Sequence, residues 1–162
     1  MKEKVISLLS EVKREGIDNL IQFIKDSDYL TTAKCYSHHR GPEGLMMHSL
    51  EVLDYMLKNN LANLPRESII LVALCHDLGK ARLDGHKVGT GQHPSRSVCI
   101  LKQCGVQLTP EEQSAIRHHH PRGFRHWVST AFKSPLQMLL QMGDCKSTGL
   151  NKRGVTYRFS AI

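Results

Sequence analysis

Apolar side chains recur every three or four residues near the start of the chain. This spacing lines one face of a helix, and it predicts two short amphipathic helices separated by Gly16. The apolar positions that define them are Val5, Leu8, Leu9, Val12, Ile17, Leu20, Ile21 and Ile24. Because each helix has one apolar face, we expect residues 1–30 to pack on the rest of a helical domain.

Five more helices are predicted farther along the chain. One of them, at 66–77, contains an apolar run from Ile69 to Leu74, which is typical of a buried helix. The five predicted ranges are 43–60, 66–77, 94–104, 110–120 and 135–146. Turns marked by glycine and proline lie between several of these ranges, at 40–44, 84–91 and 121–123.

Local signals fix the starts of the last three predicted helices. Pro94 suits the first helical position of the segment that it begins, because its missing N–H is not needed there. Thr109 and Glu112 have the spacing of a capping box, with a proline between them. Ser134 and Gln137 repeat that pattern, so we expect a helix to begin after Ser134 as well.

These elements predict a single all-α domain of about seven helices. We find no internal repeat, low-complexity tract or linker in the sequence. We divide the chain into N-terminal helices at 1–30, a core at 31–148 and a basic C-terminal tail at 149–162. The last segment, GLNKRGVTYRFSAI, is weakly strand-like, so it is either a tail or an edge segment.

Composition narrows the kinds of protein that this chain can be. Hydrophobic residues make up 40% of its 162 positions and charged residues 23%, as in ordinary globular domains. No apolar run approaches the roughly 20 residues of a membrane span, and the charged N-terminus does not resemble a signal peptide. The odd number of five cysteines, with no CxxC pair, favours a reducing cytoplasm over a disulfide framework.

The net charge of +7 favours an anionic ligand, which is either a phosphorylated metabolite or a nucleic acid. Aromatic residues make up only 6% of the chain and are not interleaved with basic residues, as they would be on a single-strand binding platform. We therefore expect a small phosphorylated partner rather than a nucleic acid or a membrane. The sequence leaves the oligomeric state open, including a homo-oligomer.

Four polar residues interrupt segments that otherwise have the pattern of buried helices. His48 lies in the middle of one predicted helix, and His76 and Asp77 end the next. Asp144 ends the last. A buried carboxylate is costly unless it is paired or bound to a metal. Because imidazole and carboxylate are common ligands of divalent cations, these four residues predict a metal site.

Four strings place these residues in a known order: GLMMHSLEV, ALCHDLGK, AIRHHH and QMGDCK. Together they resemble the HD-domain superfamily of metal-dependent phosphohydrolases, of the HD or HDIG type, and the HD-x-GK core of ALCHDLGK is the most specific part. The resemblance extends over about residues 36–148. It implies a compact HD-domain helical bundle and a divalent metal ion held by His48, His76, Asp77 and Asp144.

The superfamily has mononuclear and binuclear members, and in the binuclear case the resemblance also offers ligands for a second ion. Its ligands would be Asp77, which bridges the two ions, together with His93, His119 and His120. A water between ions roughly 3.5–4 Å apart would then be the nucleophile. The sequence does not distinguish one ion from two, nor does it choose among Mn, Fe, Mg, Co, Ni and Zn.

The resemblance also assigns catalytic roles to Asp77 and to Lys80, which would stabilise the charge that develops on a phosphate. Arg122 and Arg125 follow the histidine run, and a guanidinium group can bind a phosphate through two parallel hydrogen bonds. We therefore predict Lys80, Arg122 and Arg125 as substrate-binding residues.

The predicted function is a metal-dependent phosphohydrolase that cleaves a nucleotide or another small phosphoester with metal-activated water. The string PRGFRH follows the histidines where the cyclic-dinucleotide branch of the superfamily has a glycine-tyrosine-proline signature, which disfavours that substrate. Two alternatives stay open at this point. One is a non-catalytic HD module that senses a ligand, and the other is a di-iron oxygenase of the HD type.

Overall fold

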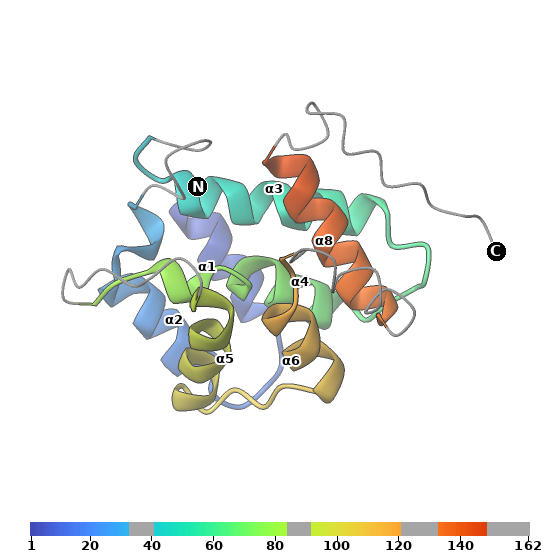
Figure 1. Ribbon diagram of the computed structural model, residues 1–162. Coiled ribbons are helices and arrows are strands. Elements are labelled where there is room, and N and C mark those ends of the chain that lie inside the picture. The colour runs from blue at the N-terminus through green and yellow to red at the C-terminus, as the bar shows by residue number, and fades with distance from the viewer. Residues whose placement is uncertain (33–40, 84–91, 121–132, 149–162) are drawn as a thin grey trace.

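The computed structural model describes residues 1–32, 41–83, 92–120 and 133–148 (Figure 1). Within these ranges the chain forms seven α-helices, two short 3-10 helices and no strand, so the all-α prediction is confirmed. The helices are α1 (Lys2–Ser10), α2 (Ile17–Asp26), η1 (Asp28–Leu30), α3 (Gly44–Lys58), α4 (Arg66–Cys75), η2 (Leu78–Lys80), α5 (His93–Gln103), α6 (Pro110–Arg117) and α8 (Pro135–Ser147). No described helix is both long enough and apolar enough to cross a bilayer.

Helix α4 runs through the middle of the domain (Figure 1). Its sequence is RESIILVALC, which is apolar on all sides after the first three residues, and every residue from Ser68 to Cys75 is buried. A helix without a polar face must be covered all round, and α1, α3, α6 and α8 all pack against it. The helix is therefore a fixed support for the two residues that follow it, His76 and Asp77.

Helices α3 and α8 pack closely against each other on one side of α4. A Cβ atom at Gly143 would lie 3.2 Å from the side chain of Val52 and 3.3 Å from its carbonyl oxygen. Only a residue without a side chain allows this approach without a shift of α3. The contact brings Asp144, the next residue of α8, close to His48 on α3.

Two boundaries near the centre of the domain differ from the predicted ones. Helix α4 ends at Cys75 and not at position 77, because Asp77 leaves the helical conformation with φ −102° and ψ 8° and precedes η2. Helix α5 begins at His93, one residue before the predicted start at Pro94. Both shifts place a predicted site residue at the edge of a helix.

The predicted end of α6 is also corrected. The helix stops at Arg117 rather than at position 120, and His118 has φ −118° and ψ 22°. The carbonyl oxygen of His118 instead accepts a hydrogen bond of 2.6 Å from Gln141 on α8. His119 and His120 therefore follow the helix in irregular backbone that α8 holds in place.

Glu112 joins the N-terminal helices to α6. Its two carboxylate oxygens accept hydrogen bonds of 2.7 Å each from the guanidinium of Arg14, between α1 and α2. The same carboxylate accepts a hydrogen bond from the backbone N–H of Thr109, which completes the predicted capping box. Burial would raise the pKa of Glu112, but the hydrogen bonds from Arg14 and its neighbours outweigh this effect and lower the pKa.

Replacing Glu112 with Gln is expected to lower the free energy of unfolding at pH 7 by about 2–3 kcal/mol, because the buried Glu112 then no longer balances the partly buried Arg14, which keeps a longer ion pair of 3.8 Å with Glu67. The pKa of Glu112 is lower in the folded chain than in the unfolded chain. The stabilisation that ionised Glu112 provides is therefore present at neutral pH, and it is lost as the pH falls through the pKa of Glu112 in the folded chain. Urea unfolding at neutral and acid pH measures the difference between wild type and variant, which should shrink in acid.

The neighbouring Glu111 is exposed and supplies the matched control. Glu111→Gln should leave the free energy of unfolding within about 0.5 kcal/mol of wild type. A Glu112→Gln variant that unfolds like Glu111→Gln at every pH would contradict this role.

Candidate metal centre

The histidines and carboxylates that the sequence predicts as metal ligands lie together at the end of α4. They reach this point from α3, from the turn after α4, from the start of α5, from the segment after α6 and from α8. All except the half-buried His120 are buried. The group consists of His48, His76, Asp77, His93, His119, His120 and Asp144.

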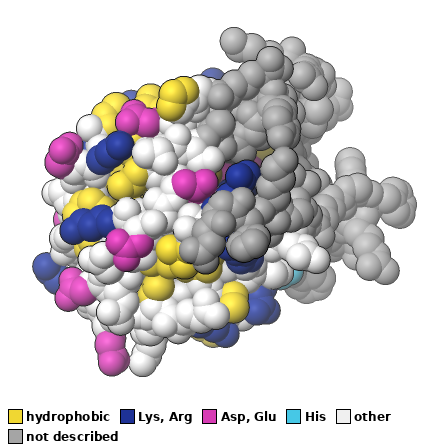
Figure 2. Space-filling view, turned by 90° about the vertical axis from the view of Figure 1, so that its left-hand side faces the viewer, with side chains coloured by type: hydrophobic (Ala, Val, Ile, Leu, Met, Phe, Trp, Pro, Cys, Tyr) yellow, Lys and Arg dark blue, Asp and Glu magenta, His cyan; other side chains and the backbone are white. Residues whose placement is uncertain are grey.

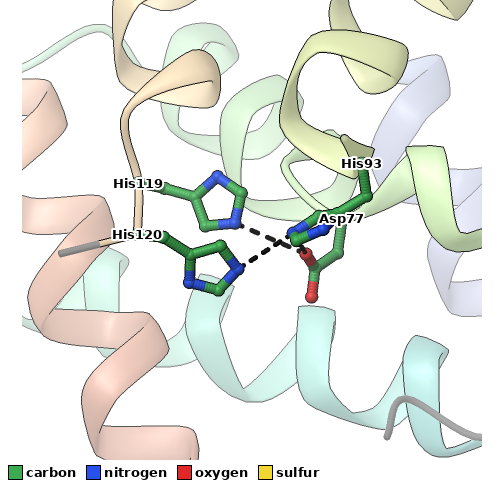
Figure 3. Close-up of side chains that lie close together, drawn as sticks. All are labelled: Asp77, His93, His119 and His120. Atoms are coloured by element: carbon green, nitrogen blue, oxygen red, sulfur yellow. Dashed lines mark hydrogen bonds and ion pairs between the residues drawn. The ribbon is translucent and has the colours of Figure 1, made fainter. Parts of the chain in front are cut away.

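Three histidines gather beside one carboxylate oxygen of Asp77, as Figure 3 shows. The Oδ1 atom of Asp77 lies 3.0 Å from Nε2 of His93 and 3.4 Å from Nε2 of His119. Nε2 of His120 lies 2.9 Å from Nε2 of His93. Each of these four residues offers a ligand atom, and these atoms all lie within 4.8 Å of one another.

The other oxygen of Asp77 faces a second group of ligands. Oδ2 lies 3.7 Å from Nε2 of His48 and 3.5 Å from Nε2 of His76, and these two nitrogens are 3.1 Å apart. Asp77 is therefore common to two candidate ion positions, one with His48 and His76 and one with the other three histidines.

Asp144 lies between the two groups. Its Oδ1 atom is 3.2 Å from Nε2 of His48, and its Oδ2 atom is 3.7 Å from Nδ1 of His120. The carboxylate thus contacts one histidine of each group from the side of α8.

Hydrogen bonds on the far side of three rings determine which nitrogen carries a proton. Nδ1 of His76 lies 2.9 Å from the carbonyl oxygen of Ala73, and Nδ1 of His119 lies 2.7 Å from that of Ile116. A carbonyl only accepts, so each of these Nδ1 atoms is protonated. In His48, Nδ1 instead contacts a serine hydroxyl.

In the neutral rings of His76 and His119, Nε2 then carries a lone pair that points toward Asp77. The buried Nε2 of His119 has no hydrogen-bond partner among the described residues. Lone pairs and carboxylate oxygens thus meet in one buried space, and they repel one another unless a cation lies between them.

The donors fit a divalent metal ion. Imidazole nitrogen and carboxylate oxygen are the common ligands of zinc and related ions. Two ligands that are each about 2.1 Å from one ion lie about 3.0–3.4 Å apart in octahedral or tetrahedral geometry. Most of the separations within each group are close to that range. Asp77 can therefore contribute one oxygen to each of two ions.

Lys80 is the basic residue beside this cluster. Its ammonium group donates a hydrogen bond of 2.7 Å to Oδ2 of Asp77 and stays partly exposed. Burial would raise the pKa of Asp77, but the surrounding histidines and the positive charge of Lys80 keep it well below its usual range. Asp77 is therefore a carboxylate, which is the form that binds metal. The other two predicted substrate residues, Arg122 and Arg125, lie outside the described residues.

Comparison with models of protein families matches residues 45–146 to the HD domain. The match covers more than half of the chain and contains all seven residues of the cluster. The chain belongs to the HD-domain family. Searches among curated proteins and among solved structures found no match.

Within this HD domain, Ser97 is a site residue that the sequence did not reveal. Its hydroxyl lies 2.8 Å from the carbonyl oxygen of His76 and 2.9 Å from that of His93, and it accepts a hydrogen bond from the N–H of Gly79. Ser97 thereby joins α5 to the turn that carries Asp77. A single serine one turn into a helix has no distinctive pattern, so no sequence signal could have found it.

Gly79 allows α5 to pack directly against the turn after Asp77. It lies in η2 with α5 directly against it, and an added Cβ atom would overlap the carbonyl oxygen of His93. The absence of a side chain thus lets His93 approach Asp77.

Replacing Gly79 with Ala is expected to lower the free energy of unfolding by about 1–3 kcal/mol, because the obstacle is backbone that cannot rotate away. Thermal or urea unfolding of the apo protein measures the change. Gly41→Ala is the control, since a Cβ atom at Gly41 meets nothing within 4 Å. If the two variants were equally stable, the close packing of α5 on η2 would not constrain the site.

Proposed function

We propose that this HD domain is a metal-dependent phosphohydrolase that acts on a nucleotide or another small phosphoester. The observation that carries the proposal is the position of Asp77, whose two oxygens face separate groups of histidines. A pair of ions sharing a carboxylate is suited to a displacement at phosphorus, because both the attacking and the leaving oxygen need positive charge nearby. Membership of the HD-domain family supports the same chemistry.

Bound metal would supply a water of lowered pKa and would polarise a phosphoryl oxygen. The protein supplies the positions. Asp77 follows α4 and His93 begins α5, and the hydrogen bonds of their Nδ1 atoms orient the rings of His76 and His119. Lys80 keeps a positive charge 2.7 Å from Asp77 at the partly exposed edge of the cluster, where it can stabilise negative charge on a phosphoryl group.

The distribution of charge supports an anionic substrate. Basic and acidic residues are equal in number over the described ranges, and they are interspersed on the face that Figure 2 shows. The net charge of +7 therefore comes from the other ranges. Those ranges adjoin the helices that carry the cluster, and they include Arg122 and Arg125, which we propose as phosphate ligands.

The ligand set favours particular metals for the group of three histidines. Mg²⁺ prefers oxygen ligands and retains several waters, whereas imidazole suits iron, cobalt, nickel and zinc. We therefore propose a first-row transition metal rather than Mg²⁺ beside His93, His119 and His120.

Turnover separates this proposal from the two alternatives. The protein is stripped with a chelator, reloaded with Mn²⁺, Fe²⁺, Co²⁺, Ni²⁺, Zn²⁺ or Mg²⁺, and assayed against nucleotides and other phosphoesters. Phosphate release supports the phosphohydrolase. A protein that binds a nucleotide or phosphoester but releases phosphate with none of these metals would be a sensing module. Oxygen consumption by the iron-loaded protein would indicate an oxygenase.

Replacing Asp77 with Ala should reduce phosphate release by about a thousand-fold or more, because both groups lose their shared ligand. The assay uses stripped and reloaded protein, and circular dichroism checks that the helices persist. Asp54→Asn is the control, since Asp54 is an exposed carboxylate on α3 that pairs with Lys58. Full activity of reloaded Asp77→Ala would show that this cluster does not perform the reaction.

A further inference from the structure

Helix α8 contacts both nitrogens of the His48 ring. Asp144 lies 3.2 Å from Nε2, on the side of the metal centre. Ser147, one turn later on the same helix, places its hydroxyl 2.8 Å from Nδ1. The ring is thus held between two residues of one helix, while its own backbone belongs to α3.

The direction of the hydrogen bonds follows from the partner of Ser147. Its hydroxyl donates to Oε2 of Glu51 at 2.6 Å. A hydroxyl has one proton, so Ser147 must accept the hydrogen bond from His48, and Nδ1 of His48 carries the proton. The lone pair of His48 is then on Nε2, which faces Asp144 and Asp77.

The chain His48–Ser147–Glu51 depends on the register of two helices. Glu51 lies three residues after His48 on α3, and Ser147 lies three residues after Asp144 on α8, so each pair shares one helix face. The close approach at Gly143 keeps these faces together. A short bond to a carboxylate is stronger than one between neutral groups and orients the serine hydroxyl.

We propose that Ser147 and Glu51 are positioning residues that fix His48 as a metal ligand. Neither residue touches the metal position. Ser147 holds the ring and its tautomer, and Glu51 orients the hydroxyl of Ser147 and makes the imidazole a stronger donor to metal. Losing a partner of this kind weakens metal binding by about 10- to 100-fold in other proteins.

A purely structural link between α3 and α8 makes a different prediction. It would change the stability of the protein, but it would leave the tautomer of His48 and the affinity for metal as they are. The test therefore measures tautomer and affinity, and it needs no substrate.

The experiment compares wild type, Ser147→Ala, Ser147→Thr and Glu51→Gln after removal of metal with a chelator. Zn²⁺ affinity is measured by competition with a chromophoric chelator. We expect Ser147→Ala to bind the tightest Zn²⁺ ion about 10- to 100-fold more weakly. Ser147→Thr keeps the hydroxyl and should restore affinity close to wild type, and Glu51→Gln should show a smaller loss than Ser147→Ala. Asp54→Asn, at the exposed carboxylate farther along α3, should bind as wild type does.

Nitrogen NMR of the histidine rings in the metal-free protein gives the second readout. Wild type should show His48 protonated at Nδ1, and Ser147→Ala should shift the ring toward the other tautomer. Unchanged tautomer and unchanged Zn²⁺ affinity in Ser147→Ala would overturn the proposal, as would a wild-type His48 protonated at Nε2. Neither the Zn²⁺ affinity nor the tautomer of His48 depends on phosphate release, so this proposal is tested independently of the proposed function.

Discussion

A carboxylate that is buried among imidazole nitrogens must be balanced by positive charge, and Asp77 is in this situation. Its oxygens lie within 3.0–3.7 Å of nitrogens from His48, His76, His93 and His119, and Lys80 donates to one of them. The surrounding fold serves to hold this arrangement. The buried helix α4 leads directly into Asp77, and Gly79 in η2 leaves room for α5 to pack against it. The contact between α3 and α8 brings Asp144 beside the cluster.

The second constraint is the direction in which the rings are protonated. The Nδ1–H groups of His76 and His119 each donate a hydrogen bond to a backbone carbonyl oxygen, and that of His48 donates to the hydroxyl of Ser147. The remaining lone pairs therefore converge with the oxygens of Asp77 and Asp144. Such a site is strained without a cation and favourable with one, so metal binding and folding are expected to be coupled.

Much of the architecture follows from the sequence because the responsible signals are local. Apolar patterns locate the first four α-helices, and proline and capping signals mark the starts of α5, α6 and α8. Helix ends are less predictable when a distant residue sets them. Helix α6 ends before His118, whose carbonyl oxygen accepts a hydrogen bond from Gln141 of α8. No pattern in the sequence near His118 predicts this contact.

The candidate ligands can be predicted from the sequence, whereas the residues that hold them in place cannot. Histidines and aspartates are conspicuous in apolar helices, so their order along the chain indicates a metal site. Ser97, Ser147 and Glu51 have ordinary polar side chains near helix ends or on exposed faces, and they acquire a role only through contacts between helices.

Anomalous diffraction tests the central claim most directly, on crystals of protein purified without a chelator and grown with added Mn²⁺ or Zn²⁺. The account predicts a metal peak bound by His48, His76, Asp77 and Asp144, and a second peak beside His93 and His119 that shares Asp77. Ordered side chains with no metal peak at either position would contradict it.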